Sequence, residues 1–173
     1  MKWSLIAIFV VLGVLLAITV IGGFLPREHR SIRQAEFHQD QQAIWNTLSD
    51  FTLLPAWMPR VGRATPVERS GGRPAWVLAT ADGEMIIEIV ETDVPRRLVT
   101  RIVDAGGPFG GTWTYDITPV EGATRVAITE DGWISNPMYR FLARYVFGTT
   151  RGMDAALRGL GDYFGETVLP AAG

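Results

Sequence analysis

The sequence contains no cysteine, two histidines and a single lysine, and each scarcity excludes a class of chemistry. Without cysteine there is no thiol nucleophile, no disulfide framework and no cysteine-based zinc or iron–sulfur site. Two histidines leave little for a histidine metal site or a serine–histidine relay. The net charge of −2 at pH 7 argues against a dedicated nucleic-acid-binding protein. At 173 residues the chain is still long enough to bury a core without disulfides or a structural metal.

One long uncharged hydrophobic run begins near the amino terminus. It covers 22 residues, Ser4–Leu25, and as a helix it would span roughly 33 Å, enough for the hydrocarbon core of a bilayer. Trp3 stands at its edge, where an indole suits the membrane interface. A cleaved signal peptide is the alternative, but its apolar region is shorter, about 7–15 residues, and ends in a small-x-small site. We therefore expect a single-pass transmembrane anchor at residues 1–26 and a separate domain at residues 27–173.

The charges that flank this run bear on its orientation. Lys2 and the α-amine precede it, whereas Arg27, Arg30 and Arg33 follow it, offset in part by Glu28. Lysine and arginine gather on the cytoplasmic side of a span, so the count favours a cytoplasmic domain by a narrow margin. All eighteen acidic residues and fifteen arginines follow the run, which leaves the domain a charge of −3. Such a domain has no general attraction for anionic lipid, so the anchor must supply the membrane attachment.

Short alternating segments separated by turn residues dominate the rest of the chain. We expect a first strand at 31–37, a helix that Asp40 caps, and a short apolar helical segment at 51–58. Six further strands are predicted at 61–69, 74–81, 84–92, 97–104, 111–119 and 124–134. Asp82-Gly83 is the strongest hairpin signal between them. Consecutive short turns indicate an antiparallel meander, because parallel strands need long crossovers.

A helical region closes the sequence. Asn136 and Pro137 provide a capping side chain and a proline at the first helical position. Apolar residues then recur on one helical face, namely at Met138, Phe141, Leu142, Tyr145 and Val146. The stripe continues at nearly the same phase across Gly148. We therefore expect either one long helix to about Val168 or two helices that meet near Gly148.

Two segments resemble a known superfamily. Segment 37–57 carries the "W…D…P.W" pattern of the START-like, or SRPBCC, superfamily as Trp45, Asp50, Pro55 and Trp57. The strand FGGTWTY at 109–115, followed by TEDG at 129–132, resembles a strand pair of its membrane-anchored bacterial branch, close to the polyketide cyclase/dehydrase-like proteins. The resemblance covers about residues 31–168. It implies an α+β helix-grip fold, in which a curved antiparallel sheet of about seven strands surrounds a long C-terminal helix.

The resemblance also implies an elongated cavity between sheet and helix. Members of the superfamily hold lipids, sterols, polyketides or other hydrophobic molecules there, and some catalyse cyclisation or dehydration. Strand and helix parity supplies inward side chains for such a pocket, although packing as plain core is the alternative for each of them. The candidate ligand-binding residues are Trp57, Trp76, Met85, Ile87, Arg101, Trp113, Tyr115, Glu130, Met138, Leu142, Met153 and Leu157.

Glu130 is the most informative of these candidates. It follows Ile128 at period two, so a regular strand turns its carboxylate toward the apolar side of the sheet. Arg101 has the same parity as Val99, and a lone buried charge is costly. We therefore expect Arg101 and Glu130 to be neighbours at the cavity wall, with Arg101 binding an acidic ligand group and Glu130 acting as a general base. An outward turn of Glu130 at a bulge, or a purely structural pair, is the alternative.

The other polar features favour structural roles. Four arginines share one arc of the last helical region, but Asp154 and Asp162 are placed to pair with them, which favours a solvated face over a lipid-binding stripe. His29 and His38 lack a second ligand at metal spacing and are expected in surface or capping roles. Gly110-Gly111 lacks the ending of a phosphate loop and is predicted to form a bulge. No cofactor, metal or nucleic-acid partner is therefore expected.

Three functions fit these observations. The favoured one is a membrane-anchored START-like domain that binds a hydrophobic small molecule or lipid without catalysis. The second is an enzyme of the polyketide cyclase/dehydrase type that uses Glu130 with Tyr115 or Arg101 as polar cavity groups. The third is a structural or interaction module whose interior is filled by side chains. An occupied cavity would separate the first two from the third.

Overall fold

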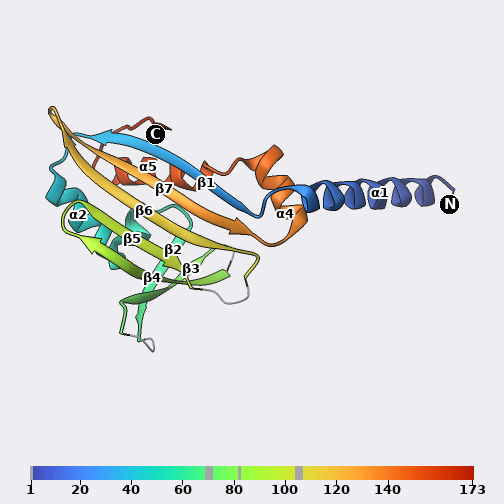
Figure 1. Cartoon of the computed structure of the whole chain (residues 1–173), viewed down its shortest axis with the longest axis horizontal. Helices are drawn as coiled ribbons and strands as arrows, with labels where there is room; N and C mark the ends of the chain where they lie inside the picture. Colours follow the sequence, from blue (N-terminus) through green and yellow to red (C-terminus); the bar gives the residue numbers. More distant parts are fainter. Residues whose placement is uncertain (1, 69–71, 82, 104–106) are drawn as a thin grey trace.

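The computed structural model describes residues 2–68, 72–81, 83–103 and 107–173, and it shows an antiparallel sheet curled around one helix (Figure 1). The strands are β1 (Glu28–Phe37), β2 (Val61–Val67), β3 (Ala75–Thr80), β4 (Gly83–Asp93), β5 (Arg97–Ile102), β6 (Phe109–Val120), β7 (Ala123–Ile134) and β8 (Ala171–Ala172). The helical segments are α1 (Lys2–Phe24), α2 (Gln41–Ser49), η1 (Phe51–Leu53), α3 (Leu54–Trp57), α4 (Pro137–Leu142), η2 (Ala143–Phe147) and α5 (Arg151–Tyr163).

The sheet has the order β2-β3-β4-β5-β6-β7-β1-β8, and its neighbouring strands are antiparallel. The helix-grip fold and the meander expected from the sequence are confirmed. The two-residue strand β8 was not predicted, because two residues are too few to show an alternating pattern. Five residues from expected strand ends and turns lie outside the described residues: Arg69, Gly71, Asp82, Asp104 and Gly106.

Both predicted helix caps are present. The Asp40 carboxylate accepts a hydrogen bond from the Ala43 backbone N–H at 2.7 Å and so starts α2. The Asn136 side chain accepts from the backbone N–H of Met138 at 2.9 Å and starts α4, with Pro137 following it. In each case a side-chain oxygen satisfies an N–H that has no partner inside the helix.

The C-terminal helical region is divided, which settles the two alternatives in favour of two helices. Gly148, at φ +76°, interrupts the region between η2 and α5, and α5 ends at Tyr163. The expected apolar stripe also separates at this point. Met153 is fully buried under the sheet, whereas Tyr145 and Val146 are 61% and 59% exposed. The continuous apolar face is therefore wrong, because the α5 part of it is buried in the core whereas Tyr145 and Val146 of η2 are exposed.

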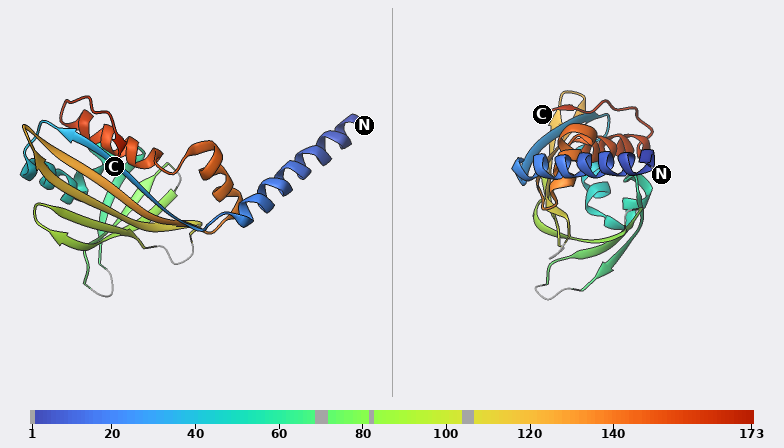
Figure 2. Two further views of the ribbon diagram at one scale, coloured as in Figure 1. Left: turned by 45° about the horizontal axis from the view of Figure 1, so that its top comes forward. Right: turned by 90° about the vertical axis from the view of Figure 1, so that its right-hand side faces the viewer.

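The hydrophobic core lies between α5 and the concave side of the sheet, toward the α2 end (Figure 2). Its most deeply buried large side chains come from β1, α2, β5, β6, β7 and α5: Phe37, Ile44, Leu98, Ile117, Val126, Ile128, Met153, Leu157 and Leu160. On the same inner side, the Arg33 guanidinium of β1 binds the Asp154 carboxylate of α5 at 2.5 Å and the Pro170 carbonyl at 2.8 Å. This ion pair joins the sheet, the last helix and the C-terminal segment.

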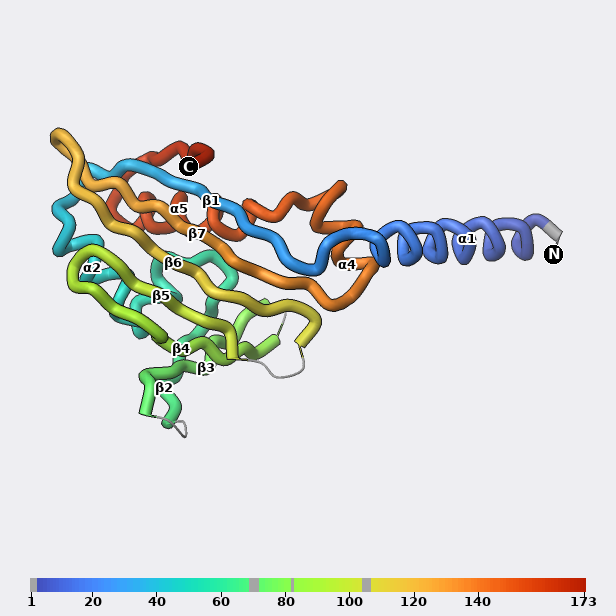
Figure 3. The backbone as a smooth tube through the Cα atoms, in the orientation of Figure 1, coloured from blue at the N-terminus to red at the C-terminus, as the bar shows by residue number. Residues whose placement is uncertain are grey.

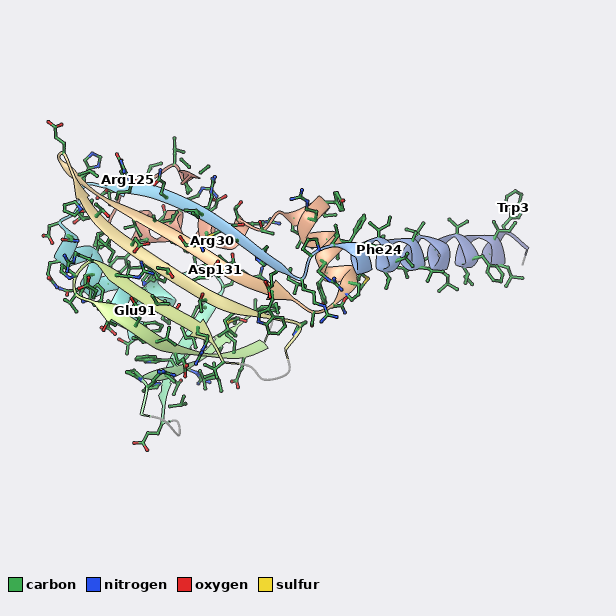
Figure 4. The ribbon with its side chains drawn as sticks, in the orientation of Figure 1. Trp3, Phe24, Arg30, Glu91, Arg125 and Asp131 are labelled. Carbon is green, nitrogen blue, oxygen red and sulfur yellow. The ribbon has the colours of Figure 1, made fainter. Side chains whose placement is uncertain are left out.

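Helix α1 projects away from the domain, and its chain passes almost directly into β1 (Figure 3). Its span Trp3–Phe24 is long and apolar enough to cross a membrane, a property that signal sequences share. Figure 4 marks its two ends, with Phe24 beside the domain and Trp3 at the far end. The domain end of α1 packs so closely on α4 that a Cβ added to Gly22 would overlap the Pro137 backbone. The joint between α1 and the sheet is thus a packed contact.

Candidate functional site

The end of the sheet nearest α1 is hollow, whereas the α2 end is filled by the core. A cavity of about 410 Å³ lies there, a volume typical of small-molecule sites, which range from about 300 to 1,000 Å³. The lining residues come from β1–β7, the α3–β2 loop and the η2–α5 segment: His29, Met58, Pro59, Arg60, Val61, Leu78, Thr80, Met85, Ile87, Thr100, Ile102, Phe109, Gly110, Gly111, Trp113, Tyr115, Glu130, Trp133, Ile134, Ala143, Gly148 and Thr149. Aliphatic and aromatic side chains dominate this wall.

A carboxylate and an imidazole meet at the α1 end of the cavity. Glu130 lies on β7 opposite Trp113 of β6 and Ser31 of β1, in a row that faces the inside of the sheet. The His29 Nε2 atom is 3.7 Å from the Glu130 Oε1 atom, and their side chains are 22% and 23% exposed. A half-buried pair of this kind can accept or donate hydrogen bonds to a polar group on an otherwise apolar ligand.

Tyr115 lies one inward position further along β6 than Trp113, and the two rings make an edge contact with centroids 6.1 Å apart. Burial, together with the nearby negative charge of Glu130, raises the pKa of the Tyr115 phenol well above its ordinary value of 10.0. The phenol therefore stays protonated at neutral pH. It adds a second polar group to the cavity wall that can donate a hydrogen bond.

Tyr115 should ionise only in strongly alkaline solution. In a spectrophotometric titration, we expect Tyr115 to remain neutral at pH 10, the ordinary pKa of a tyrosine. Because the folded state holds this proton more tightly than the unfolded state, its contribution to stability is present below about pH 10 and is lost as the pH rises further. Tyr115→Phe should remove that alkaline loss, and Tyr139→Phe should not. A difference between the wild-type and Tyr115→Phe titrations that shows a phenol ionising at pH 10 would contradict the burial of Tyr115.

Two paired glycines leave space in the sheet next to the His29 imidazole. Gly111 of β6 pairs with Gly132 of β7, which pairs with His29 of β1. A Cβ on Gly132 would approach the His29 imidazole to 2.7 Å, so the glycine leaves the room that the ring occupies. Gly111, at φ +149°, sits against the Asp131 carbonyl. The predicted bulge at Gly110-Gly111 is wrong, because the β6–β7 pairing runs through both glycines without a shift.

Five of the twelve predicted ligand-binding residues lie in the wall of this one cavity: Met85, Ile87, Trp113, Tyr115 and Glu130. The other seven lie outside its lining. Trp57, Met153 and Leu157 are buried in the core, and Trp76 stacks on Phe51 with ring centroids 4.4 Å apart. The α4 residues Met138 and Leu142 are also outside the wall.

Arg101 is the seventh, and its predicted pairing with Glu130 is wrong. In the register of β5, Arg101 is opposite Glu88 of β4 and Thr112 of β6, on the outer face, and its guanidinium binds the Glu88 carboxylate. The inner face of β5 instead carries Leu98, Thr100 and Ile102. Strand β5 has apolar residues at both parities, so alternation alone could not select the inner one.

His29 is the polar cavity residue that sequence reasoning missed. It was expected in a surface or capping role because it lacks a second ligand at metal spacing, and the first strand was predicted to begin only at residue 31. Strand β1 in fact begins at Glu28, and His29 then shares the inner parity of Ser31 and Arg33. This shared parity was the sequence signal that could have identified His29 as an inward-facing residue. The histidine could have been placed inside if the strand had been extended by three residues toward the anchor.

The family comparison agrees with this geometry. Residues 31–165 match the model of the family described as polyketide cyclase / dehydrase and lipid transport. No protein with a curated description matches the sequence.

Solved structures share the fold at low identity. A conserved protein from Geobacillus kaustophilus superposes with a TM-score of 0.66 at 14% identity, over 82% of this chain and 99% of that one. The di-domain ARO/CYC protein StfQ of the steffimycin biosynthetic pathway gives 0.63 at 14%, over 79% of this chain and 50% of that one. A START superfamily protein from Mycobacterium smegmatis gives 0.57 at 20%, over 78% and 96%. At these identities the likeness concerns the fold alone.

Proposed function

Because the chain belongs to the polyketide cyclase / dehydrase and lipid transport family, we propose that its START-like domain binds a hydrophobic small molecule or lipid in the cavity described above. The observation that carries the proposal is the hollow, mostly apolar end of a sheet whose other end is fully packed. A module filled by its own side chains would not leave about 410 Å³ at one end. The proposed activity is binding without catalysis.

The wall of the cavity indicates the chemistry of the ligand. Trp113 and aliphatic residues such as Ile87 and Ile102 would contact an apolar body, which gains free energy by leaving water. Glu130, His29 and Tyr115 would bind one polar group at the α1 end. A hydroxyl or amide group suits these partners better than a carboxylate, which Glu130 would repel. An amphipathic molecule with a single hydrogen-bonding head group therefore fits the site best.

Membrane attachment is the second part of the proposal. Residues 1–26 would form the anchor and residues 27–173 the binding domain, with α1 spanning the bilayer. The flanking arginines favour a cytoplasmic domain. The cavity lies at the end of the sheet where β1 leaves α1, so its mouth would stand close to the membrane surface. A bilayer is a natural source or destination for a hydrophobic ligand.

Filling the cavity should strongly lower ligand retention. Ile87 lines the cavity, and its neighbour Ile86 lies on the opposite face of β4. We expect Ile87→Trp to lower the retained ligand about tenfold, because an indole in the apolar cavity excludes other atoms from the same space. Native and denaturing mass spectra of the full chain, released from detergent micelles in the gas phase, would be compared for retained small-molecule mass.

Ile86→Trp is the matched control, since it adds the same ring to the outer surface and should retain as much ligand as the wild type. Unfolding midpoints of the two variants would check that both are folded. A clean apo mass for the wild type after incubation with a lipid extract would overturn the proposal. Release of a ligand chemically different from the one supplied, dependent on Glu130, would instead favour the cyclase/dehydrase alternative.

A further inference from the structure

A second cavity, of about 500 Å³, lies at the joint between α1 and the domain. Its walls come from the segment that follows α1, the start of β1, the end of β7 and the segment from α4 to the η2–α5 loop. Four arginines line it: Arg27, Arg30, Arg140 and Arg144. Glu28 is the acidic residue in its lining. Asp131 of β7 is not in the lining, but its carboxylate pairs with the Arg30 guanidinium at 3.4 Å (Figure 4). The cavity is therefore strongly basic within a domain whose overall charge is negative.

Arg140 is the informative residue of this group. Arg140 is only 7% exposed, and its Nη1 atom donates a hydrogen bond to the Leu25 carbonyl at 2.7 Å. Its Nε atom is buried without a hydrogen-bond partner, and among the described residues the guanidinium has no carboxylate partner. A buried guanidinium without a counter-charge is costly, so its presence in a cavity wall indicates an anionic ligand.

Two further arginines line the cavity together with Arg140. Arg27 lies immediately before β1, and Arg144 lies in η2. Both line the same cavity, and neither forms an ion pair with the described residues. The guanidinium group presents several N–H donors in a plane, which matches the oxygens of a phosphate. Three arginines against the single carboxylate of Glu28 leave an excess of positive charge for such a group.

The position of the cavity identifies the source of the phosphate. It lies directly after Phe24, the last residue of α1, so α1 in a bilayer would place the cavity at the level of the lipid phosphates. Tyr145 lines the cavity, and the adjoining Val146 and Phe147 are exposed, as suits side chains beside acyl chains. We propose that this cavity binds the phosphate of an anionic lipid headgroup. The inference rests on the proposed membrane attachment of α1, but it concerns a second cavity, which adjoins the hydrophobic one and shares His29, Ile134, Ala143 and Thr149 with its wall.

The test uses the full chain in micelles of a nonionic detergent, which contain no phosphate. Dioctanoyl phosphatidic acid, dioctanoylglycerol and inorganic phosphate are added separately, and the thermal unfolding midpoint is measured, because a ligand that binds the native state stabilises it by mass action. In Ile87→Trp, whose hydrophobic cavity is filled, phosphatidic acid should raise the midpoint and dioctanoylglycerol should not. In Arg27→Gln/Arg144→Gln, the same rise should require about tenfold more phosphatidic acid, since charge-assisted hydrogen bonds are lost.

Arg151→Gln/Arg158→Gln removes the same charge from exposed positions of α5 and should behave as the wild type. Ile87→Trp should keep the phosphatidic acid effect, which separates this site from the hydrophobic cavity. In this variant, an equal response to inorganic phosphate would overturn the lipid source, and an equal response to dioctanoylglycerol would overturn the phosphate. Loss of the effect in Ile87→Trp, or an equal loss in the α5 control, would overturn the assignment to this cavity.

Discussion

Gly159→Ala is expected to destabilise the protein by about 2–3 kcal/mol or to prevent folding. Gly159 is buried in α5, and a Cβ at this position would overlap the Trp57 carbonyl oxygen and lie 3.0 Å from the Pro59 ring. The Trp57 carbonyl belongs to the backbone of α3 and cannot rotate away, so the helices must separate. The gain from replacing glycine by alanine in a helix, at most about 1 kcal/mol, does not offset this overlap.

Gly152→Ala supplies the control on the same helix. A Cβ at Gly152 would meet the Trp113 ring at 3.6 Å, an ordinary van der Waals distance, and the residue is exposed. We expect this variant to be as stable as the wild type or more stable by about 0.5–1 kcal/mol. Urea unfolding of both variants in detergent micelles would measure the difference. An unchanged midpoint for Gly159→Ala would show that α3 and α5 are not packed backbone to backbone.

Asp154→Ala is expected to cost about 2–3 kcal/mol of unfolding free energy. The change leaves the Arg33 guanidinium on the inner face of β1 with the Pro170 carbonyl as its remaining partner. Breaking a fully buried pair costs more, about 3–5 kcal/mol. The two side chains here keep 19% and 17% of their exposure, so water reaches the pair and reduces the penalty.

A double-variant cycle would separate the ion pair from other effects of this change. Arg33→Met/Asp154→Leu replaces both charges by apolar groups of comparable size and should recover most of the stability lost in Asp154→Ala. Asp162→Ala removes a carboxylate from an exposed position of the same helix and should change the free energy of unfolding by less than about 0.5 kcal/mol. Equal losses in Asp154→Ala and Asp162→Ala would mean that the Arg33 contact contributes nothing.

Local sequence signals predicted most of this fold. Alternating strands, short turns and two helix caps gave the order of the elements and the antiparallel meander, since each of these signals is set by neighbours in the chain. Inward parity was also correct where one face of a strand is clearly apolar, as in β6 and β7, and it placed Tyr115 and Glu130 in the cavity wall. These positions required no knowledge of distant contacts.

The errors arose where the outcome depends on partners far away in the chain. Arg101 was placed inside because β5 has apolar residues on both faces. Only the pairing of Arg101 with Glu88 of the neighbouring strand β4 shows which face is outer. Tyr145 continues an apolar helical stripe, yet the break at Gly148 directs it away from the core. The second cavity was missed for the same reason, because Arg27 and Arg140 are far apart in sequence and meet only where α4 packs on α1.

The short joint between α1 and β1 limits how far the domain can travel. Only Leu25, Pro26 and Arg27 separate the two elements, and the Arg140 guanidinium holds the Leu25 carbonyl. Soluble carriers and domains on long flexible linkers can sample a wide volume, because the reach of a linker grows with its length. The three residues between α1 and β1 give this domain no comparable range of movement relative to α1. With α1 in a bilayer, any exchange of ligand would be confined to the leaflet beneath it, and delivery to a second membrane would require that membrane to come into contact.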